Sequence, residues 1–94
     1  MISFNTKPFQ ESESELLTDE KPNHRLILFN DDYHTFDFVI ETLIKVCSHD
    51  LIQAEQCTYL VHYAGKCVVK EGDYSKLEPL CTALHDRGLT AEIV

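Results

Sequence analysis

The hydrophobic residues of this chain follow two spacings, one typical of strands and one typical of helices. Residues 25–29 (Arg-Leu-Ile-Leu-Phe) form a short apolar run, which predicts a strand buried on both faces. Thr35 then offers an N-cap for a helix of about three turns. The apolar stripe of this helix consists of Phe36, Val39, Ile40, Leu43, Ile44 and Cys47.

A second helix is predicted directly after the first. Asp50 and, three residues later, Gln53 resemble a capping box that opens it, and Gly65 is placed to end it. Because only Ser48 and His49 separate the two helices, they should form an αα-hairpin. The apolar positions of the second helix are Ala54, Cys57, Leu60, Val61 and Ala64.

The rest of the chain predicts two more strands with a helix between them. Residues 66–70 suit a strand, a capping box of Ser75 and Glu78 opens a helix that ends near Arg87, and residues 89–94 form the last strand. The predicted order is therefore β-α-α-β-α-β. This order predicts an α+β fold, a two-layer sandwich in which three helices cover one face of a three-stranded sheet.

Composition narrows the possible functions. The 94 residues suit one domain, and the net charge of -8 argues against nucleic acid or an anionic membrane surface as a partner. No apolar run approaches the roughly 20 residues that span a bilayer, and no signal peptide is visible, so we expect a cytoplasmic protein. Residues 1–23 hold five carboxylates, two lysines and few apolar groups. They predict a flexible acidic tail ahead of a core domain at residues 24–94.

The cysteines do not suggest a metal site. They are widely spaced, and no C-x-x-C motif is present, so we expect small buried apolar side chains and neither a metal nor a cofactor. The four are Cys47, Cys57, Cys67 and Cys81.

Polar residues with a candidate function follow the first strand. Asn30, Asp31 and Asp32 come directly after it, and Thr58 and His62 share one face of the second helix. Together they would offer several acceptors beside apolar side chains, which suits a primary ammonium with its three donors. A free α-amino group next to an apolar side chain would satisfy both halves of such a site.

Other interpretations of these residues remain open. Asn-Asp-Asp after a strand is often only a turn, and two carboxylates with one histidine could hold a metal ion. A hydrolase is disfavoured, because the chain has no G-x-S-x-G motif and no local signature ties a cysteine to His62. A general protein-interaction module of the same architecture is the main alternative to capture of an α-amino group.

Three segments together resemble the core of the ClpS family. They are residues 28–33 (Leu-Phe-Asn-Asp-Asp-Tyr), residues 36–39 (Phe-Asp-Phe-Val) and residues 61–66 (Val-His-Tyr-Ala-Gly-Lys). The resemblance implies the fold predicted above. It also implies an adaptor, not an enzyme, that binds N-degrons, which are the N-terminal Leu, Phe, Tyr or Trp residues of substrate proteins. The implied partner is a AAA+ Clp unfoldase, ClpA- or ClpC-like, working with ClpP.

The resemblance also implies roles for individual residues. Asn30, Asp32 and His62 would hold the substrate α-amino group, with Asp31 beside them, and Tyr63 would belong to the helix end and the core. The side-chain pocket would be lined by Phe36, Val39, Leu43, Thr58, Val61 and Leu89.

The chain departs from the usual family pattern next to these residues. His34-Thr35-Phe36 stands where Thr-Pro-Met is common, and that Met excludes β-branched first residues in the family. Thr58 stands where Met is frequent, which predicts a smaller and more polar pocket wall. The third helix matches the family poorly, and part of the unfoldase-docking surface of the family lies there.

Overall fold

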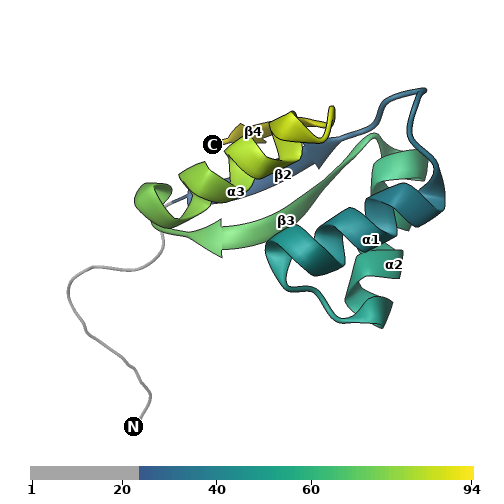
Figure 1. Cartoon of the computed structure of the whole chain (residues 1–94), viewed down its shortest axis with the longest axis horizontal. Coiled ribbons are helices and arrows are strands. Elements are labelled where there is room, and N and C mark those ends of the chain that lie inside the picture. The colour runs from purple at the N-terminus through teal and green to yellow at the C-terminus, as the bar shows by residue number, and fades with distance from the viewer. Residues whose placement is uncertain (1–23) are drawn as a thin grey trace, which may run out of the picture.

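The computed structural model describes residues 24–94 and confirms the predicted α+β fold (Figure 1). The acidic segment at residues 1–23, which we expect to be a flexible tail, lies outside the described residues. The elements are β2 (His24–Phe29), α1 (Phe36–Cys47), α2 (Leu51–Ala64), β3 (Lys66–Gly72), α3 (Tyr74–Asp86) and β4 (Thr90–Ile93).

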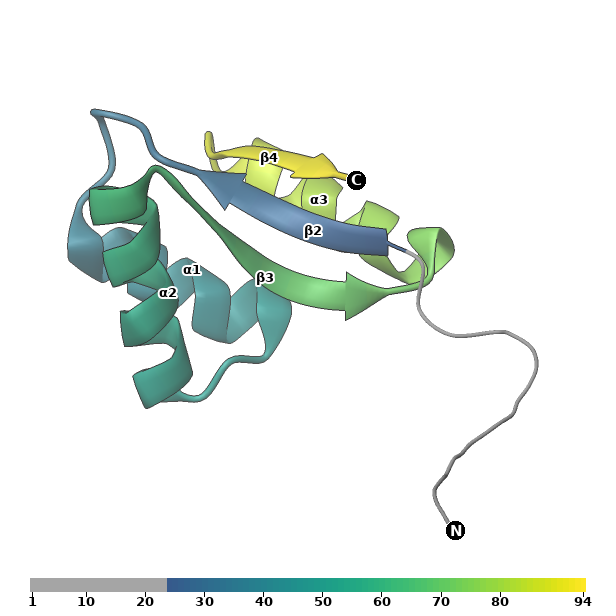
Figure 2. The same cartoon turned by 180° about the vertical axis from the view of Figure 1, so that it is seen from behind.

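The sheet places β2 in the centre, with β3 and β4 antiparallel on either side. Leu26 and Leu28 of β2 are fully buried, whereas the alternate residue Ile27 is only half-buried. The prediction that this strand is buried on both faces is therefore wrong. Figure 2 shows the face of the sheet that points away from α3. A uniformly apolar run hides this period-2 alternation, because Ile27 is as hydrophobic as its buried neighbours.

The predicted caps of the first two helices are confirmed. Thr35 Oγ1 accepts a hydrogen bond from the Phe38 N–H (3.1 Å), and Asp50 Oδ1 accepts one from the Gln53 N–H (2.8 Å). Gly65 ends α2 with φ at 95°, a left-handed conformation that glycine adopts without steric cost. These caps fix where α1 begins and where α2 ends, and both points border the site described below.

The start of α3 differs from the prediction. The helix begins at Tyr74, and the backbone carbonyl of Asp73 accepts hydrogen bonds from the N–H groups of Lys76 and Leu77. Asp73 is thus the N-cap residue, although its side chain forms no capping hydrogen bond. A capping box of Ser75 and Glu78 is therefore not formed, because Ser75 already lies inside the first turn.

The hydrophobic core lies between the sheet and the helices. Its fully buried residues include Leu26, Leu28, Leu43, Ala54 and Leu84, so every layer contributes to one cluster. The Arg87 guanidinium donates a hydrogen bond to Thr42 Oγ1 (3.1 Å), which joins the end of α3 to α1.

The cysteines largely follow the prediction. Cys47, Cys57 and Cys81 are buried, Cys67 is half-buried, and all four are free thiols. Burial raises the pKa of the Cys47 thiol from its ordinary value of 9.0 to about 11, so this thiol stays protonated near neutral pH.

Candidate functional site

The site forms where the end of β2 meets the end of α2. Phe29 of β2 pairs with Lys66 of β3, and the Asn30 N–H donates to the carbonyl of Gly65 (3.0 Å). Because α2 leads directly into β3, this pairing brings the last turn of α2, which carries His62, beside the residues that follow β2. Two segments far apart in the sequence thus meet as predicted.

A pocket lies between these segments. Its volume is about 290 Å³ when the space at its open mouth is included. Most of this space is open to solvent, and the enclosed part of the pocket is no larger than a single water molecule needs. The apolar residues of its wall come from β2, α1, α2 and the segment before β4, and they are Leu28, Phe29, Val39, Val61 and Leu89. The remaining lining residues are Asn30, Asp31, His34, Thr35, Phe36, Thr58 and His62.

Two of the predicted site residues do not line this pocket. Leu43 is fully buried, because it lies one helical turn further along α1 than Val39 and so belongs to the core. Asp32 is exposed on the loop after β2, outside the lining. The other eight predicted residues lie together around the pocket.

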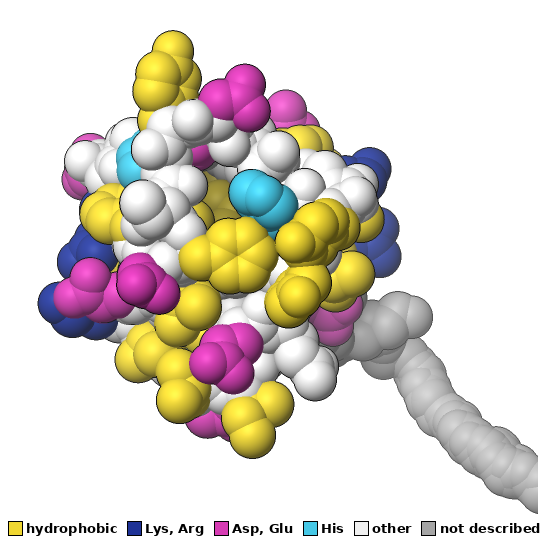
Figure 3. Space-filling model, turned by 90° about the vertical axis from the view of Figure 1, so that its right-hand side faces the viewer, with side chains coloured by type: hydrophobic (Ala, Val, Ile, Leu, Met, Phe, Trp, Pro, Cys, Tyr) yellow, Lys and Arg dark blue, Asp and Glu magenta, His cyan; other side chains and the backbone are white. Residues whose placement is uncertain are grey.

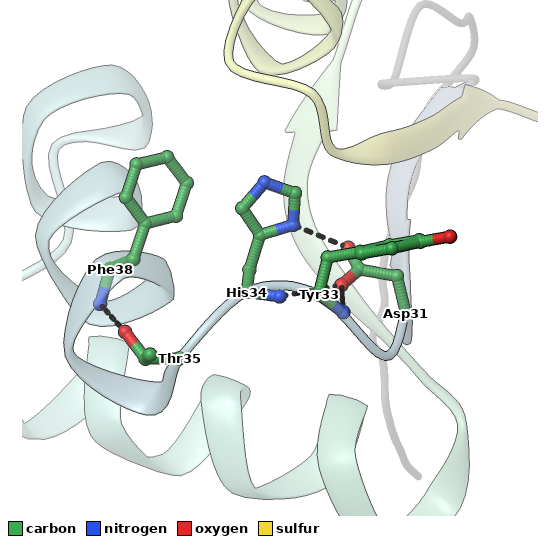
Figure 4. A network of polar contacts seen from close by, with 5 residues as sticks. All are labelled: Asp31, Tyr33, His34, Thr35 and Phe38. Carbon is green, nitrogen blue, oxygen red and sulfur yellow. Dashed lines mark hydrogen bonds and ion pairs between the residues drawn. The ribbon is translucent and has the colours of Figure 1, made fainter.

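Asp31 builds the loop between β2 and α1 (Figure 4). Its Oδ1 accepts hydrogen bonds from the N–H groups of Tyr33 (2.8 Å) and His34 (2.9 Å), and its Oδ2 accepts one from His34 Nδ1–H (2.8 Å). Partial burial acts to raise the pKa of Asp31, but these hydrogen bonds from His34 and Tyr33 outweigh it and lower the pKa below 3.8. Both carboxylate oxygens are therefore already bonded within the loop.

His34 fixes this loop against the rest of the fold, a role that sequence reasoning missed. Its ring stacks on the ring of Phe38, with 4.8 Å between centroids and 23° between planes. On another side it meets Gly88, where an added Cβ would lie 3.3 Å from His34 Nε2. An Asp followed three residues later by a His was the available signal, since Asp side chains commonly bond backbone groups two and three residues ahead.

Aromatic rings lie at and beside the mouth of the pocket. The Phe36 ring meets the His62 ring edge to face at 4.8 Å and the Tyr59 ring at 5.7 Å. Tyr63 packs against Tyr59 at 4.9 Å and is 71% exposed, so the interpretation of Tyr63 as a core residue is wrong. Leu60 is also exposed, contrary to its predicted place on the apolar face of α2.

The polar side chains at the pocket differ in whether they are already hydrogen-bonded within the protein. The side chains of Asn30, Asp32 and His62 form no hydrogen bond or ion pair with any other residue between 24 and 94. The Thr58 hydroxyl, in contrast, donates to the carbonyl of Ala54 (2.7 Å). Thr58 thus offers the pocket no free donor, and its wall is less polar than the sequence suggests.

The charge around the site is negative. Residues 30–64 include six carboxylates and one lysine, Lys45, which already pairs with Glu41 at 2.9 Å. Figure 3 views the molecule from this end and shows a histidine flanked by hydrophobic side chains, with carboxylates around them. Such a surface attracts cationic groups and repels anionic ones.

Other kinds of site find no support in the described part of the chain. Among residues 24–94, no group of three or more His, Cys, Asp or Glu side chains is placed to hold a metal ion. Within the same residues, no helix is long and apolar enough to cross a membrane.

Comparison with known proteins places the sequence in a family. The sequence matches the family described as ATP-dependent Clp protease adaptor protein ClpS over residues 19–92. It is 40% identical over 65 residues to the ATP-dependent Clp protease adapter protein ClpS of Pectobacterium carotovorum, which is 61% of each chain. It is also 44% identical over 45 residues to that of Salmonella gallinarum, covering 48% of this chain and 42% of the relative. The chain thus spans between 42% and 61% of the length of these curated relatives.

A solved structure shares the fold. Agrobacterium tumefaciens ClpS2 bound to L-phenylalaninamide superposes with a TM-score of 0.64 at 21% identity, over 76% of this chain and 93% of that one. Because the family match covers most of the sequence, this chain belongs to the ClpS family, whose members are adaptors of the Clp protease and not enzymes.

Proposed function

We propose that this protein is a cytoplasmic adaptor that captures proteins by their first residue when it is Leu, Phe, Tyr or Trp. It then delivers them to a AAA+ Clp unfoldase, ClpA- or ClpC-like, working with ClpP. One observation carries the proposal: a pocket with an apolar wall ends at a rim where the side chains of Asn30 and His62 have no hydrogen-bond partner among residues 24–94. The ClpS2 structure supports it, because L-phenylalaninamide carries a free α-amino group next to an aromatic side chain.

The polar rim would bind the α-amino group. Asn30 and His62 line the mouth, and an ammonium can donate to the Asn30 side-chain oxygen and to a neutral His62 ring. Asp32, exposed on the adjacent loop, supplies the negative charge and the third acceptor. Asp31 supports the group indirectly, because both of its oxygens hold the loop.

The apolar wall would receive the first side chain. Val39, Val61 and Leu89 are each less than a tenth exposed and line the pocket together with Thr58. Leu43 supports this wall from the core without lining it. Since the enclosed part of the pocket is so small, a large side chain can enter only if the Phe36 ring, which lies edge to face with His62 at the mouth, turns aside.

The two halves together give a useful affinity. An aromatic side chain buries roughly 150–250 Å², which contributes roughly 4–6 kcal/mol at about 25 cal/mol per Å². Hydrogen bonds to a charged ammonium add about 1.5–3 kcal/mol each, and association costs at least about 4 kcal/mol. With three such hydrogen bonds the surplus is roughly 4–11 kcal/mol, a range centred on a dissociation constant near the micromolar range, which holds a substrate and still releases it.

A peptide panel that differs only in the first residue tests the proposal by fluorescence anisotropy. Peptides beginning with Leu, Phe, Tyr or Trp should bind, those beginning with Gly or Glu should not, and acetylation of the Phe peptide should abolish binding because it removes the charge. His62→Ala should weaken binding, whereas Tyr74→Ala on α3 should not. Equal binding of the acetylated and free peptides would favour a general interaction module over capture of an α-amino group.

A further inference from the structure

Two parts of the pocket wall belong to elements that lie far apart in the sequence. Val39 is on α1, whereas Leu89 is in the short segment between α3 and β4, and both side chains line the pocket. Each is less than a tenth exposed. The width of the pocket therefore depends on how α1 and the end of α3 are held relative to each other.

Leu89 is fixed to the end of α3 by backbone hydrogen bonds. Its N–H donates to the carbonyl of Leu84 (3.0 Å), and the Gly88 N–H donates to the carbonyl of His85 (2.9 Å). Gly88 has φ at 84°, the left-handed conformation that closes such a turn after a helix. Leu89 therefore keeps its place relative to α3, and any shift of the helix end carries Leu89 with it.

Arg87 joins this helix end to α1. Its Nη1–H donates to Thr42 Oγ1 (3.1 Å), and Thr42 lies three residues after Val39, on the same side of α1. Thr42 is fully buried, so the hydrogen bond is shielded from water at this end. Among residues 24–94, no other hydrogen bond joins α1 to α3.

The contact of Gly88 with His34 acts in the opposite direction. Figure 4 shows the His34 ring pointing toward the yellow turn that precedes β4. An added Cβ on Gly88 would lie 3.3 Å from His34 Nε2, so little space remains between them. This packing limits how closely the turn can approach α1, but it does not stop the turn from moving away. The hydrogen bond from Arg87 to Thr42 is the contact that resists separation.

We propose that Arg87 is a positioning residue for the pocket, which through Thr42 holds Leu89 near Val39 and thereby disfavours Trp as the first residue relative to Leu. The inference deepens the proposed function and rests on it, because the first side chain must occupy this pocket. The small enclosed space of the pocket supports it, since walls held close together leave little room for the largest side chain.

Fluorescence anisotropy with a Trp-first and a Leu-first peptide tests the role of Arg87. Arg87→Met keeps an unbranched side chain but removes the donor. The ratio of Trp-first to Leu-first affinity should then rise about fourfold, which is what one further buried methylene group contributes. Thr42→Val removes the acceptor from the other end of the same bond and should raise the ratio equally. The double variant should raise it no further, because the bond is already broken.

Two further variants are controls. Arg87→Lys retains a donor and should keep a ratio near that of wild type. Lys76→Met removes the same charge from an exposed position in the first turn of α3, away from the pocket lining, and should leave the ratio unchanged. The ratio is the readout, so a general loss of stability or affinity does not mimic the expected result.

The outcomes separate this inference from the proposed function. If Arg87→Met and Thr42→Val both keep the wild-type ratio, the hydrogen bond only stabilises the fold, and the inference is overturned while capture of the first residue stands. If one of these variants does not fold, the other decides, because it breaks the same bond. If wild type binds neither peptide, the proposed function itself fails.

Discussion

Replacing Asp31 by alanine removes three hydrogen bonds that hold the loop between β2 and α1. Hydrogen bonds to a charged group contribute about 1.5–3 kcal/mol each. After the substitution the freed N–H groups can donate to water instead, which offsets part of this loss. The side chains of His34 and Asp31 are 21% and 17% exposed, so their contact is mostly shielded. We therefore expect a loss of about 2–3 kcal/mol, or roughly 10–20 °C in Tm for a domain of this size.

Asp31→Asn separates the contribution of the backbone N–H groups from that of the His34 ring. An asparagine keeps one oxygen for the two backbone N–H groups but loses the carboxylate that accepts from the His34 ring. The expected loss is about 1 kcal/mol, and in a His34→Ala background the same change should cost much less, since the partner is already gone. Urea unfolding of the four variants measures this coupling.

The stability of these variants should also depend differently on pH. The folded protein lowers the pKa of Asp31 below its ordinary value of 3.8, so its carboxylate stabilises the fold fully above that value. This stabilisation is lost as the pH falls through the lowered pKa. Asp31→Asn should therefore lose less stability than wild type between about pH 5 and pH 2.

The result that would refute this reasoning is specific. If Asp31→Asn unfolds like wild type at every pH yet no longer binds a Phe-first peptide, Asp31 acts directly on the α-amino group and not through the loop. Unfolding curves and peptide titrations on the same protein samples distinguish the two roles.

Three further predictions follow from other parts of the molecule. Phe36→Ala should widen the mouth of the pocket, so anisotropy should show the affinity of Val-first peptides rising relative to Phe-first peptides; an unchanged ratio would exclude Phe36 as a gate. The pKa of about 11 predicts a thiolate fraction for Cys47 about 100-fold below that of an ordinary thiol at pH 8. Thiol labelling of native protein should therefore leave Cys47 unmodified, and rapid labelling would contradict its burial. Deletion of residues 2–20 should spare peptide binding and slow degradation by the unfoldase and ClpP. An unchanged degradation rate would show that the tail is not needed for delivery.

The sequence predicted those features that depend on neighbouring residues. Thr35, Asp50 and Gly65 set helix ends through contacts within one turn, so a local pattern was enough. The predicted start of α3 was wrong for a related reason. Asp73 and Ser75 can both cap a helix, and only the path of the chain after β3 decides between them.

The features that sequence reasoning missed depend on tertiary contacts. The half-burial of Ile27 results from one sheet face being left without a full cover, which its hydrophobicity cannot reveal. Tyr63 continues an apolar pattern at the end of α2, yet it extends past the edge of the core and packs against Tyr59. His34 gains its role only because Phe38 and Gly88 meet it from two other elements.

The three polar residues after β2 carry different tasks, and this division orders the polar rim of the candidate site before any ligand binds. Asn30 is held by its backbone bond to Gly65, and its side chain forms no hydrogen bond with any residue between 24 and 94. Asp31 uses its side chain to order the loop, which leaves Asp32 exposed beside the mouth. Because the loop is ordered before a ligand arrives, binding need not also order its backbone, which costs roughly 1–2 kcal/mol per residue. Changes at His34 should therefore weaken capture through loop order, even though the proposed contacts to the α-amino group come from Asn30, Asp32 and His62.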